Sequence, residues 1–169
     1  TEQKLYTRYI ELYLAACIRK EGHKAMLIDA LAEQLTSDEV AERVIRNSPD
    51  ILALTGTTPQ ISFAFEVINK VNAINPSIIV VLGGPHATAT PIETLKKCPN
   101  IDYLVYSEGE ITIVELLSAI EKGKKTPEIM RTVKGIYIIT KKGHQFSGIR
   151  PYIENLDVLP FPERYLVRN

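Results

Sequence analysis

The sequence predicts an α/β domain, a three-layer sandwich in which helices cover both faces of a mostly parallel β-sheet. Apolar runs rich in valine, isoleucine and leucine occur at residues 50–56, 77–84 and 101–107. Segments with helical spacing of apolar residues separate these runs. Continuous apolar strands that alternate with helices are typical of a parallel sheet buried on both faces.

The first element is an amphipathic helix over residues 5–20, and Gly22 follows it as a left-handed cap. Its apolar positions at helical spacing are Leu5, Tyr9, Leu12, Tyr13, Ala16 and Cys17. Residues 24–30 ("KAMLIDA") read as a short buried strand. A second helix over residues 36–47 begins at a capping Thr36 or Ser37.

The alternation then continues to Gly123 and stops there. Its further elements are strands at 50–56, 77–84 and 101–107, and helices at 59–74, 92–97 and 108–121. Two β-like runs around a Lys-Lys-Gly turn predict an antiparallel hairpin over residues 135–149. We therefore expect a domain over residues 1–150 and a proline-rich linker over residues 151–169.

Composition excludes several classes of function. Twenty basic residues balance twenty acidic ones, so charge gives no reason to expect a nucleic-acid or membrane partner. The two cysteines form no CxxC pair, which argues against zinc-ribbon and iron–sulfur ligation within this chain. Without a signal peptide or an apolar stretch of roughly 20 residues, the chain is expected to be soluble and cytoplasmic.

The sheet is expected to be incomplete. An open parallel sheet of this type normally starts with a central strand, whereas this sequence starts with a helix. The first strand is therefore expected to be missing, and the unpaired strand edge that it leaves should favour self-association.

Two loops rich in glycine and threonine follow neighbouring strands, at Thr55–Thr58 and Gly83–His86. Ligands of open parallel sheets bind beyond the carboxyl ends of the strands, where glycine allows close approach and hydroxyl groups form hydrogen bonds. Each loop also has an ordinary interpretation, as a tight turn or a helix cap. The lone His86 has no neighbouring ligand for a metal site. The shared position of the loops favours a binding site.

Five segments together resemble the N-terminal cobalamin-binding domain of radical S-adenosylmethionine enzymes, a class that includes anaerobic magnesium-protoporphyrin IX monomethyl ester cyclase. They are "YLAACIRKEGHKAMLIDA", "PDILALTGTTP", "NPSIIVVLGGPHATATP", "IDYLVYSEGE" and "LDVLPFPER". The resemblance runs from about Tyr9 to the C-terminus. It implies a flavodoxin-like (Rossmann-like) domain that holds cobalamin, a corrinoid, over the carboxyl ends of its strands.

The resemblance also implies a set of cofactor-binding residues. Thr55, Gly56, Thr57 and Thr58 would line one side of the channel for the cofactor tail, Gly83, Pro85, His86 and Gly84 the other, with Glu108, Gly109 and Glu110 near the corrin edge. The glycines would leave room for the tail, and the threonines would bind its polar groups.

Three departures from the family pattern limit what this chain does. The first strand of the family is absent. The DxHxxG motif, whose histidine binds cobalt in other corrinoid proteins, is also absent, and His86 is not expected to take that role. The CxxxCxxC motif for an iron–sulfur cluster is also absent, so the cluster and S-adenosylmethionine are expected only in a downstream domain. The chain would then be the non-catalytic, cofactor-binding part of an enzyme for methyl transfer or oxidative cyclisation, possibly in tetrapyrrole synthesis.

Two other functions remain open on the residues alone. A stand-alone flavodoxin-like regulatory or interaction domain, such as a phosphoacceptor receiver, would need a lysine after the last parallel strand, and "IDYLVYSEGE" has none. A nucleotide or flavin enzyme would be expected to carry a GxGxxG motif or a P-loop, and neither is present.

Overall fold

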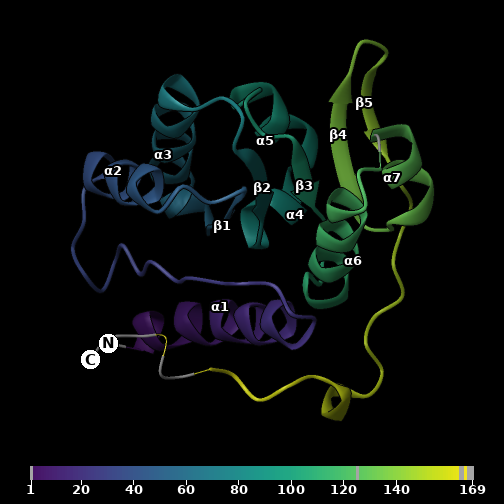
Figure 1. Cartoon of the computed structure of the whole chain (residues 1–169), viewed down its shortest axis with the longest axis horizontal. Helices are drawn as coiled ribbons and strands as arrows, with labels where there is room; N and C mark the ends of the chain where they lie inside the picture. Colours follow the sequence, from purple (N-terminus) through teal and green to yellow (C-terminus); the bar gives the residue numbers. More distant parts are fainter. Residues whose placement is uncertain (1, 125, 164–165, 167–169) are drawn as a thin grey trace.

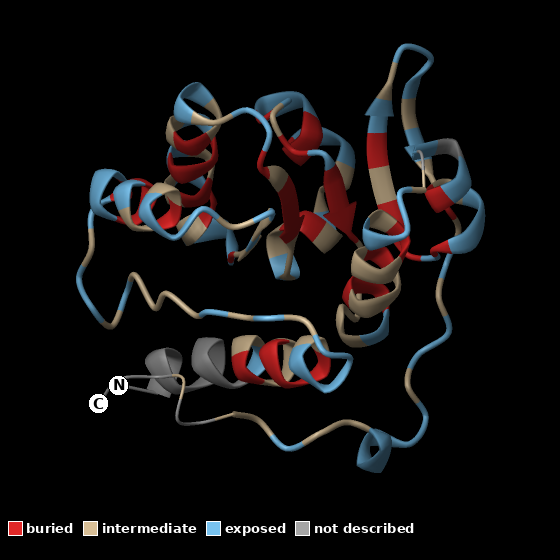
Figure 2. Cartoon of the chain, viewed as in Figure 1, coloured by how far each residue is buried: buried red, intermediate tan, exposed pale blue. Residues whose placement is uncertain are grey.

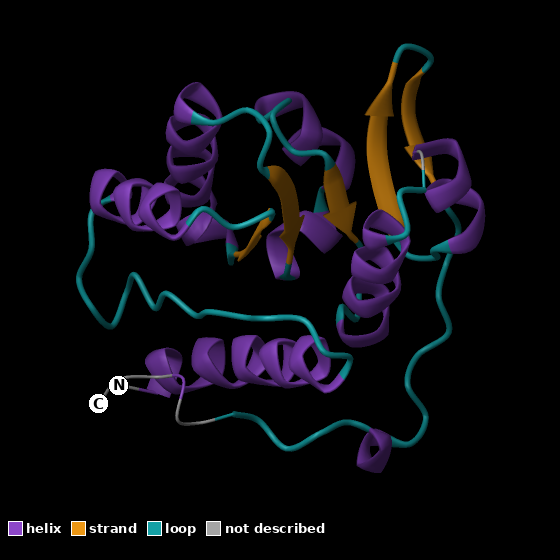
Figure 3. Ribbon diagram, in the orientation of Figure 1, coloured by secondary structure: helices purple, strands orange, loops and turns teal. Residues whose placement is uncertain are grey.

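The computed structural model describes residues 2–124, 126–163 and 166, and its centre is a five-stranded sheet with helices on both faces (Figures 1 and 3). The strands are β1 (Ile51–Thr55), β2 (Ile79–Gly83), β3 (Tyr103–Val105), β4 (Ile136–Thr140) and β5 (Gly143–Phe146). They lie side by side in the order of the chain. The predicted α/β sandwich is confirmed.

The sheet changes from parallel to antiparallel at β4. β1, β2 and β3 are parallel, and Ile51 lies opposite Ile79. β4 is antiparallel to β3, and β5 is antiparallel to β4. The hairpin expected over residues 135–149 is therefore confirmed, with its turn at Lys141 and Lys142.

Seven α-helices lie in the described part of the chain. They are α1 (Glu2–Lys20), α2 (Ser37–Asn47), α3 (Ile61–Ile74), α4 (Pro85–Ala89), α5 (Pro91–Lys97), α6 (Glu110–Glu121) and α7 (Thr126–Thr132). Two 3-10 turns, η1 (Thr58–Gln60) and η2 (Leu156–Val158), complete the set. Of the two expected caps of α2, Thr36 is the N-cap, because its hydroxyl accepts from the Glu39 N–H. α7 was not predicted from the sequence.

Two apolar layers hold the helices to the sheet. On one face, α3, α4 and α5 pack on a cluster centred on Ile68, Leu82 and Leu104. On the other face, α6 and α7 pack on Val81 and Ile136. Figure 2 shows buried residues along β2 and β3 and on α3 and α6. These layers set the positions of the loops at the strand ends.

Residues 24–30 do not form the expected strand. The segment is extended without ladder pairing (Figure 3), and Met26 is 55% exposed. A strand needs a neighbour for its backbone hydrogen bonds, and no described strand pairs with this segment. Ile28 and Ala30 pack instead against the α2–α3 cluster. Apolar content alone therefore led to the wrong prediction.

β1 is an edge strand of the sheet. Among the described strands, β1 pairs only with β2.

α1 lies beyond the carboxyl ends of β2 and β3 and packs against α6 (Figure 1). Leu12, Ala16 and Cys17 are buried as expected, whereas the side chains of Leu5 and Tyr9 fall outside the described residues. No described helix is long and apolar enough to cross a membrane.

Candidate functional site

The loops after β1 and β2 meet at Gly84. This residue has φ 94° and ψ −177°, a backbone conformation used almost only by glycine. A Cβ atom there would lie 2.2 Å from Thr55 Oγ1 and 3.1 Å from Gly56 N. At Gly83 a Cβ atom would meet only ordinary contact, 3.5 Å from Val105 Cβ. Gly84 is thus required by the chain's own packing, in addition to any ligand.

His86 connects the same two loops by hydrogen bonds. Its backbone N–H donates to the Gly56 carbonyl oxygen at 3.3 Å. Its Nδ1 lies 3.1 Å from Thr58 Oγ1, and its Nε2 lies 3.5 Å from Thr90 Oγ1. Both ring nitrogens therefore face threonine hydroxyl groups, and the side chain is half-buried.

The threonines after β1 begin the next helical segment. The Thr57 hydroxyl donates to Gln60 Oε1 at 2.8 Å, and Gln60 Oε1 also accepts from the Thr57 backbone N–H at 3.2 Å. Thr57, Thr58 and Pro59 are exposed, while Gly56 is buried beneath them. The loop therefore places two exposed threonines at the carboxyl end of β1, with hydroxyl groups that also contact Gln60 and His86.

Thr88 joins this pair of loops to the loop after β3, a role that the sequence analysis missed. Its hydroxyl accepts from the Ser107 backbone N–H at 3.0 Å. Ser107 has φ 67°, a left-handed conformation that this contact helps to hold. The motif "GGPHATAT" contained the signal, because short hydroxyl residues beside a strand end often bond to neighbouring loops.

Glu108, Gly109 and Glu110 face α1 and the C-terminal segment in this structure. The Glu108 carboxylate accepts from the Ile153 N–H at 2.9 Å. A Cβ atom on Gly109 would lie 3.2 Å from Leu14 on α1. Glu110 Oε2 is buried and has no hydrogen-bond partner in the described part of the chain. The structure therefore brings the loops after β1 and β2 into direct contact. Residues 108–110, after β3, border the same edge of the sheet but face α1 and the C-terminal segment instead.

Cys17 on α1 is close enough to Glu110, at the start of α6, to respond to its charge. Burial, and then the charge of Glu110, raises the pKa of the Cys17 thiol. Cys17 and Cys98 are both buried and free. Within the described ranges, no group of three or more potential ligands could hold a metal ion.

Replacing Glu108 should release the C-terminal segment. Glu108→Ala removes the acceptor of the Ile153 N–H, so the Ile153 amide should exchange with solvent faster and unfolding should become easier by about 1 kcal/mol. Amide hydrogen exchange measures the first effect and urea unfolding the second. Glu108→Gln keeps an acceptor oxygen and should retain most of the protection. Equal protection of Ile153 in the alanine variant would contradict this role.

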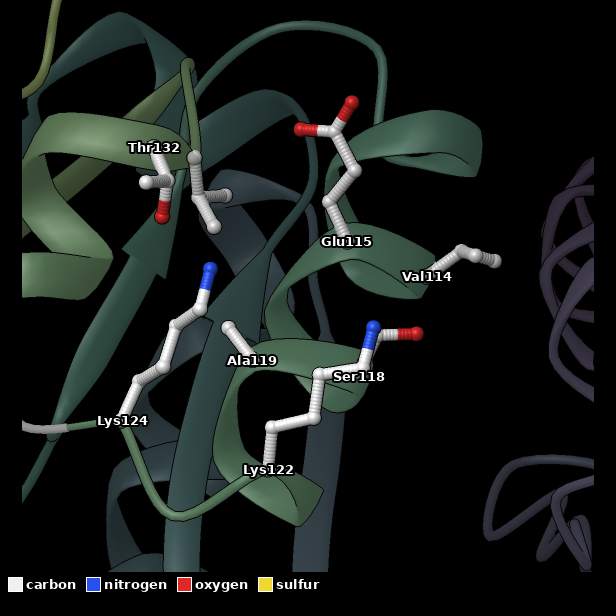
Figure 4. Close-up of a pocket in the computed structure, with 8 residues that line it drawn as sticks. Val114, Glu115, Ser118, Ala119, Lys122, Lys124 and Thr132 are labelled. Carbon is white, nitrogen blue, oxygen red and sulfur yellow. The ribbon is translucent and has the colours of Figure 1, made fainter.

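A separate hollow lies between α6 and α7, with a volume of about 230 Å³ (Figure 4). Its polar groups come from Glu115, Ser118, Lys122, Lys124 and Thr132. It borders the C-terminal half of α6, whereas the loops described above lie near the N-terminus of that helix. The hollow is therefore a different place from the loop site.

The geometry of a mixed sheet with glycine and hydroxyl loops at its carboxyl edge agrees with the family comparison. The B12 binding domain family model matches residues 5–117. The chain belongs to the B12-binding domain family, and the resemblance to radical S-adenosylmethionine enzymes is confirmed.

Its relatives include proteins of two kinds. It is 39% identical over 153 residues to "Uncharacterized methyltransferase PH0819" of Pyrococcus horikoshii, covering 89% of this chain and 32% of that protein. It is 33% identical over 147 residues to anaerobic magnesium-protoporphyrin IX monomethyl ester cyclase of Rubrivivax gelatinosus, covering 86% of this chain and 26% of that protein. The chain thus spans about a third or less of these relatives.

A solved structure shares the fold. The radical S-adenosylmethionine methyltransferase TsrM of Kitasatospora setae, with cobalamin and a [4Fe-4S] cluster bound, superposes with a TM-score of 0.72 at 19% identity. The match covers 94% of this chain and 29% of that protein. At this identity the likeness describes the architecture alone.

Proposed function

We propose that this chain is the cobalamin-binding module of a larger radical S-adenosylmethionine enzyme. The observation that carries the proposal is the direct contact of the loops after β1 and β2, through Gly84 and His86, within a B12-binding domain. The exposed hydroxyl groups of Thr57 and Thr58 lie at this contact, as binding of a polar cofactor tail requires. The family membership favours this function over a receiver or a flavin enzyme.

The residues present fit the polar tail of cobalamin. Thr57, Thr58 and the backbone of the loops from Thr55 to Thr58 and from Gly83 to His86 would hold the tail. A bound cobalamin supplies methyl-transfer or radical chemistry through its cobalt, and the protein supplies position and access. Glu108 would act indirectly, by fixing the C-terminal segment beside the corrin edge, and Glu110 would border the same edge.

Cofactor binding can be tested on the chain itself. Titration with hydroxocobalamin, followed by absorption, should show saturable binding, and Thr58→Val should weaken it about tenfold because one hydrogen-bonding hydroxyl is lost at equal volume. The matched control is Lys124→Ala in the hollow between α6 and α7, which should bind as tightly as the native chain. Binding that depends on Lys124 and not on Thr58 would place the cofactor elsewhere. Absence of binding to the native chain would contradict the function for this chain.

The cobalt should carry no protein histidine, and the base of the cofactor itself should be displaced. The ring nitrogens of His86 face Thr58 and Thr90, and the chain has no DxHxxG motif. The absorption and electron paramagnetic resonance spectra of the cob(II)alamin form should therefore be identical for the native chain and His86→Ala. A nitrogen splitting that disappears in the variant would show that His86 binds cobalt.

We also propose that residues 151–169 lead to a catalytic domain that binds the iron–sulfur cluster and S-adenosylmethionine. Tyr152, Leu156, Val158 and Phe161 are exposed apolar side chains in this segment, and Phe161 is 93% exposed. Exposed apolar side chains in series are typical of a surface that another domain covers.

The buried free thiols suit a reducing, cytoplasmic setting. Methyl transfer and oxidative cyclisation both remain candidates, since the relatives include both kinds of enzyme.

A further inference from the structure

A continuous chain of hydrogen-bonding side chains runs from the exposed loop after β1 into the core. It begins at Thr58 and passes through both ring nitrogens of His86. It continues from Thr90 to Thr94, which is completely buried on α5. The Thr94 hydroxyl donates to the Thr90 carbonyl oxygen at 2.7 Å, so the Thr94 oxygen can only accept from the Thr90 hydroxyl. The direction of the inner end of the chain is therefore fixed.

The position of the proton on the His86 ring follows from this inner end. The Thr90 hydroxyl has one proton, and its possible acceptors are the His86 carbonyl oxygen at 3.3 Å, Thr94 Oγ1 at 3.4 Å and His86 Nε2 at 3.5 Å. Because both oxygen atoms are nearer than the ring nitrogen, Nε2 is bonded by carrying a proton itself and donating it to Thr90 Oγ1. A neutral imidazole has one N–H, so Nδ1 accepts from the Thr58 hydroxyl at 3.1 Å.

We propose that His86 is a positioning residue that makes Thr58 a hydrogen-bond acceptor for the cofactor, an inference that rests on the proposed function. Neutral Nδ1 takes the only hydroxyl proton of Thr58, so the oxygen of this exposed residue offers its remaining lone pair to a ligand. The ligand group bound there must carry its own N–H or O–H. In cobalamin, such groups are the amides of the corrin ring and of the tail linker, and the ribose hydroxyl groups. The phosphate of the tail has no such proton, so Thr58 does not bind it.

The opposite ring state would reverse this preference. With the proton on Nδ1, the ring would donate to Thr58 Oγ1, and the free Thr58 proton would suit a phosphate oxygen. Nε2 would then depend on the Thr90 proton, for which the two oxygen atoms compete at shorter distances. The proton on Nε2 satisfies every member of the chain, and this is the reason for the assignment.

The ring state can be measured on the chain without cofactor. Long-range proton–nitrogen NMR spectra at about pH 8 distinguish a proton on Nε2 from one on Nδ1 or on both nitrogens. The sequence has three histidines, and the signals that disappear in His86→Ala are those of His86. We expect the proton on Nε2. A proton on Nδ1, or on both nitrogens, would overturn the inference whether or not the chain binds a corrinoid.

Titration with hydroxocobalamin tests the effect on binding. His86→Ala keeps the backbone bond to Gly56 but releases the Thr58 hydroxyl, so the dissociation constant should rise about threefold. In a Thr58→Val background the same change should have no further effect, because His86 acts through Thr58. His144→Ala on β5 is the matched control and should bind as tightly as the native chain. Independent, additive effects of the two substitutions would contradict a positioning role.

Cobinamide, which lacks the phosphate, the ribose and the base, identifies the donor. Equal weakening of cobinamide and cobalamin by Thr58→Val would support an amide as the donor, and weakening of cobalamin alone would support a ribose hydroxyl. Inorganic phosphate that competes with hydroxocobalamin for the native chain, but not for Thr58→Val, would overturn the inference. A native chain that binds neither corrinoid would contradict the proposed function. A native chain that binds them with the proton on Nδ1 of His86 would contradict this inference alone.

Discussion

Gly84→Ala should cost about 3 kcal/mol of folding free energy and abolish cobalamin binding. The backbone conformation at Gly84, with φ 94° and ψ −177°, costs a residue with a side chain about 1–3 kcal/mol. The added methyl group would also lie 2.2 Å from Thr55 Oγ1 and 3.1 Å from Gly56 N, so the Thr55 side chain and the adjoining backbone must shift. Urea unfolding without cofactor measures the stability, and hydroxocobalamin titration measures the binding.

The matched control adds the same methyl group one residue earlier. Gly83→Ala meets Val105 at an ordinary distance of 3.5 Å, so it should change stability by less than about 1 kcal/mol. In a Thr55→Ala background the Gly84→Ala penalty should shrink, because the overlapping oxygen is gone. Similar stabilities for the Gly83 and Gly84 variants would contradict the close contact between the loops.

Glu11→Gln should stabilise the chain by about 2 kcal/mol at pH 8 and remove part of its pH dependence. Burial, and then the charge of Asp29, raises the pKa of Glu11 from 4.5 to about 7. Below pH 4.5 the carboxyl is protonated in both the folded and the unfolded state, and no penalty exists. As pH rises toward about 7 the folded state loses free energy relative to the unfolded state, and above that pH the full penalty persists. Glu11 is only partly buried, so solvent screening reduces the penalty to about 2 kcal/mol.

Urea unfolding at pH 4 and pH 8 (about one half unit below and one unit above the titration range) measures this effect. The difference between the variant and the native chain isolates Glu11 from the other titrating groups. Glu42→Gln, at an exposed position on α2, is the matched control for the removal of one carboxylate. A constant difference between Glu11→Gln and the native chain across this range would show that Glu11 does not titrate as stated.

The parallel strands could be predicted because their apolar runs are continuous and short, and the helices between them carry regular spacing. The segment at 24–30 has the same composition, yet it forms no strand, since a strand depends on a neighbour that local sequence does not reveal. α7 was not predicted because it is short and has Pro127 near its start. Pairing and short helices are therefore the parts of the fold that the sequence left undetermined.

The candidate site was predictable only in its outline. Parallel strands bring their carboxyl ends to one edge, so the meeting of the loops after β1 and β2 could be expected. The bond from Glu108 to Ile153 joins residues 45 positions apart and has no local signature. The glycine at Gly84 was attributed to a ligand or to a tight turn, whereas the structure shows that Thr55 of the same chain already fills the space where a side chain would go.

The antiparallel hairpin has a consequence for the path of the chain. β4 reverses the direction of β3, and β5 reverses it again, so β5 points the same way as β1, β2 and β3. The backbone after Phe146 therefore leaves the sheet at the end from which the loops after β1 and β2 project (Figure 1). Arg150 then bonds to Thr112 on α6 at 2.8 Å and fixes this exit. An odd number of added strands would have sent the chain out at the far end, roughly one strand length from the loops after β1 and β2.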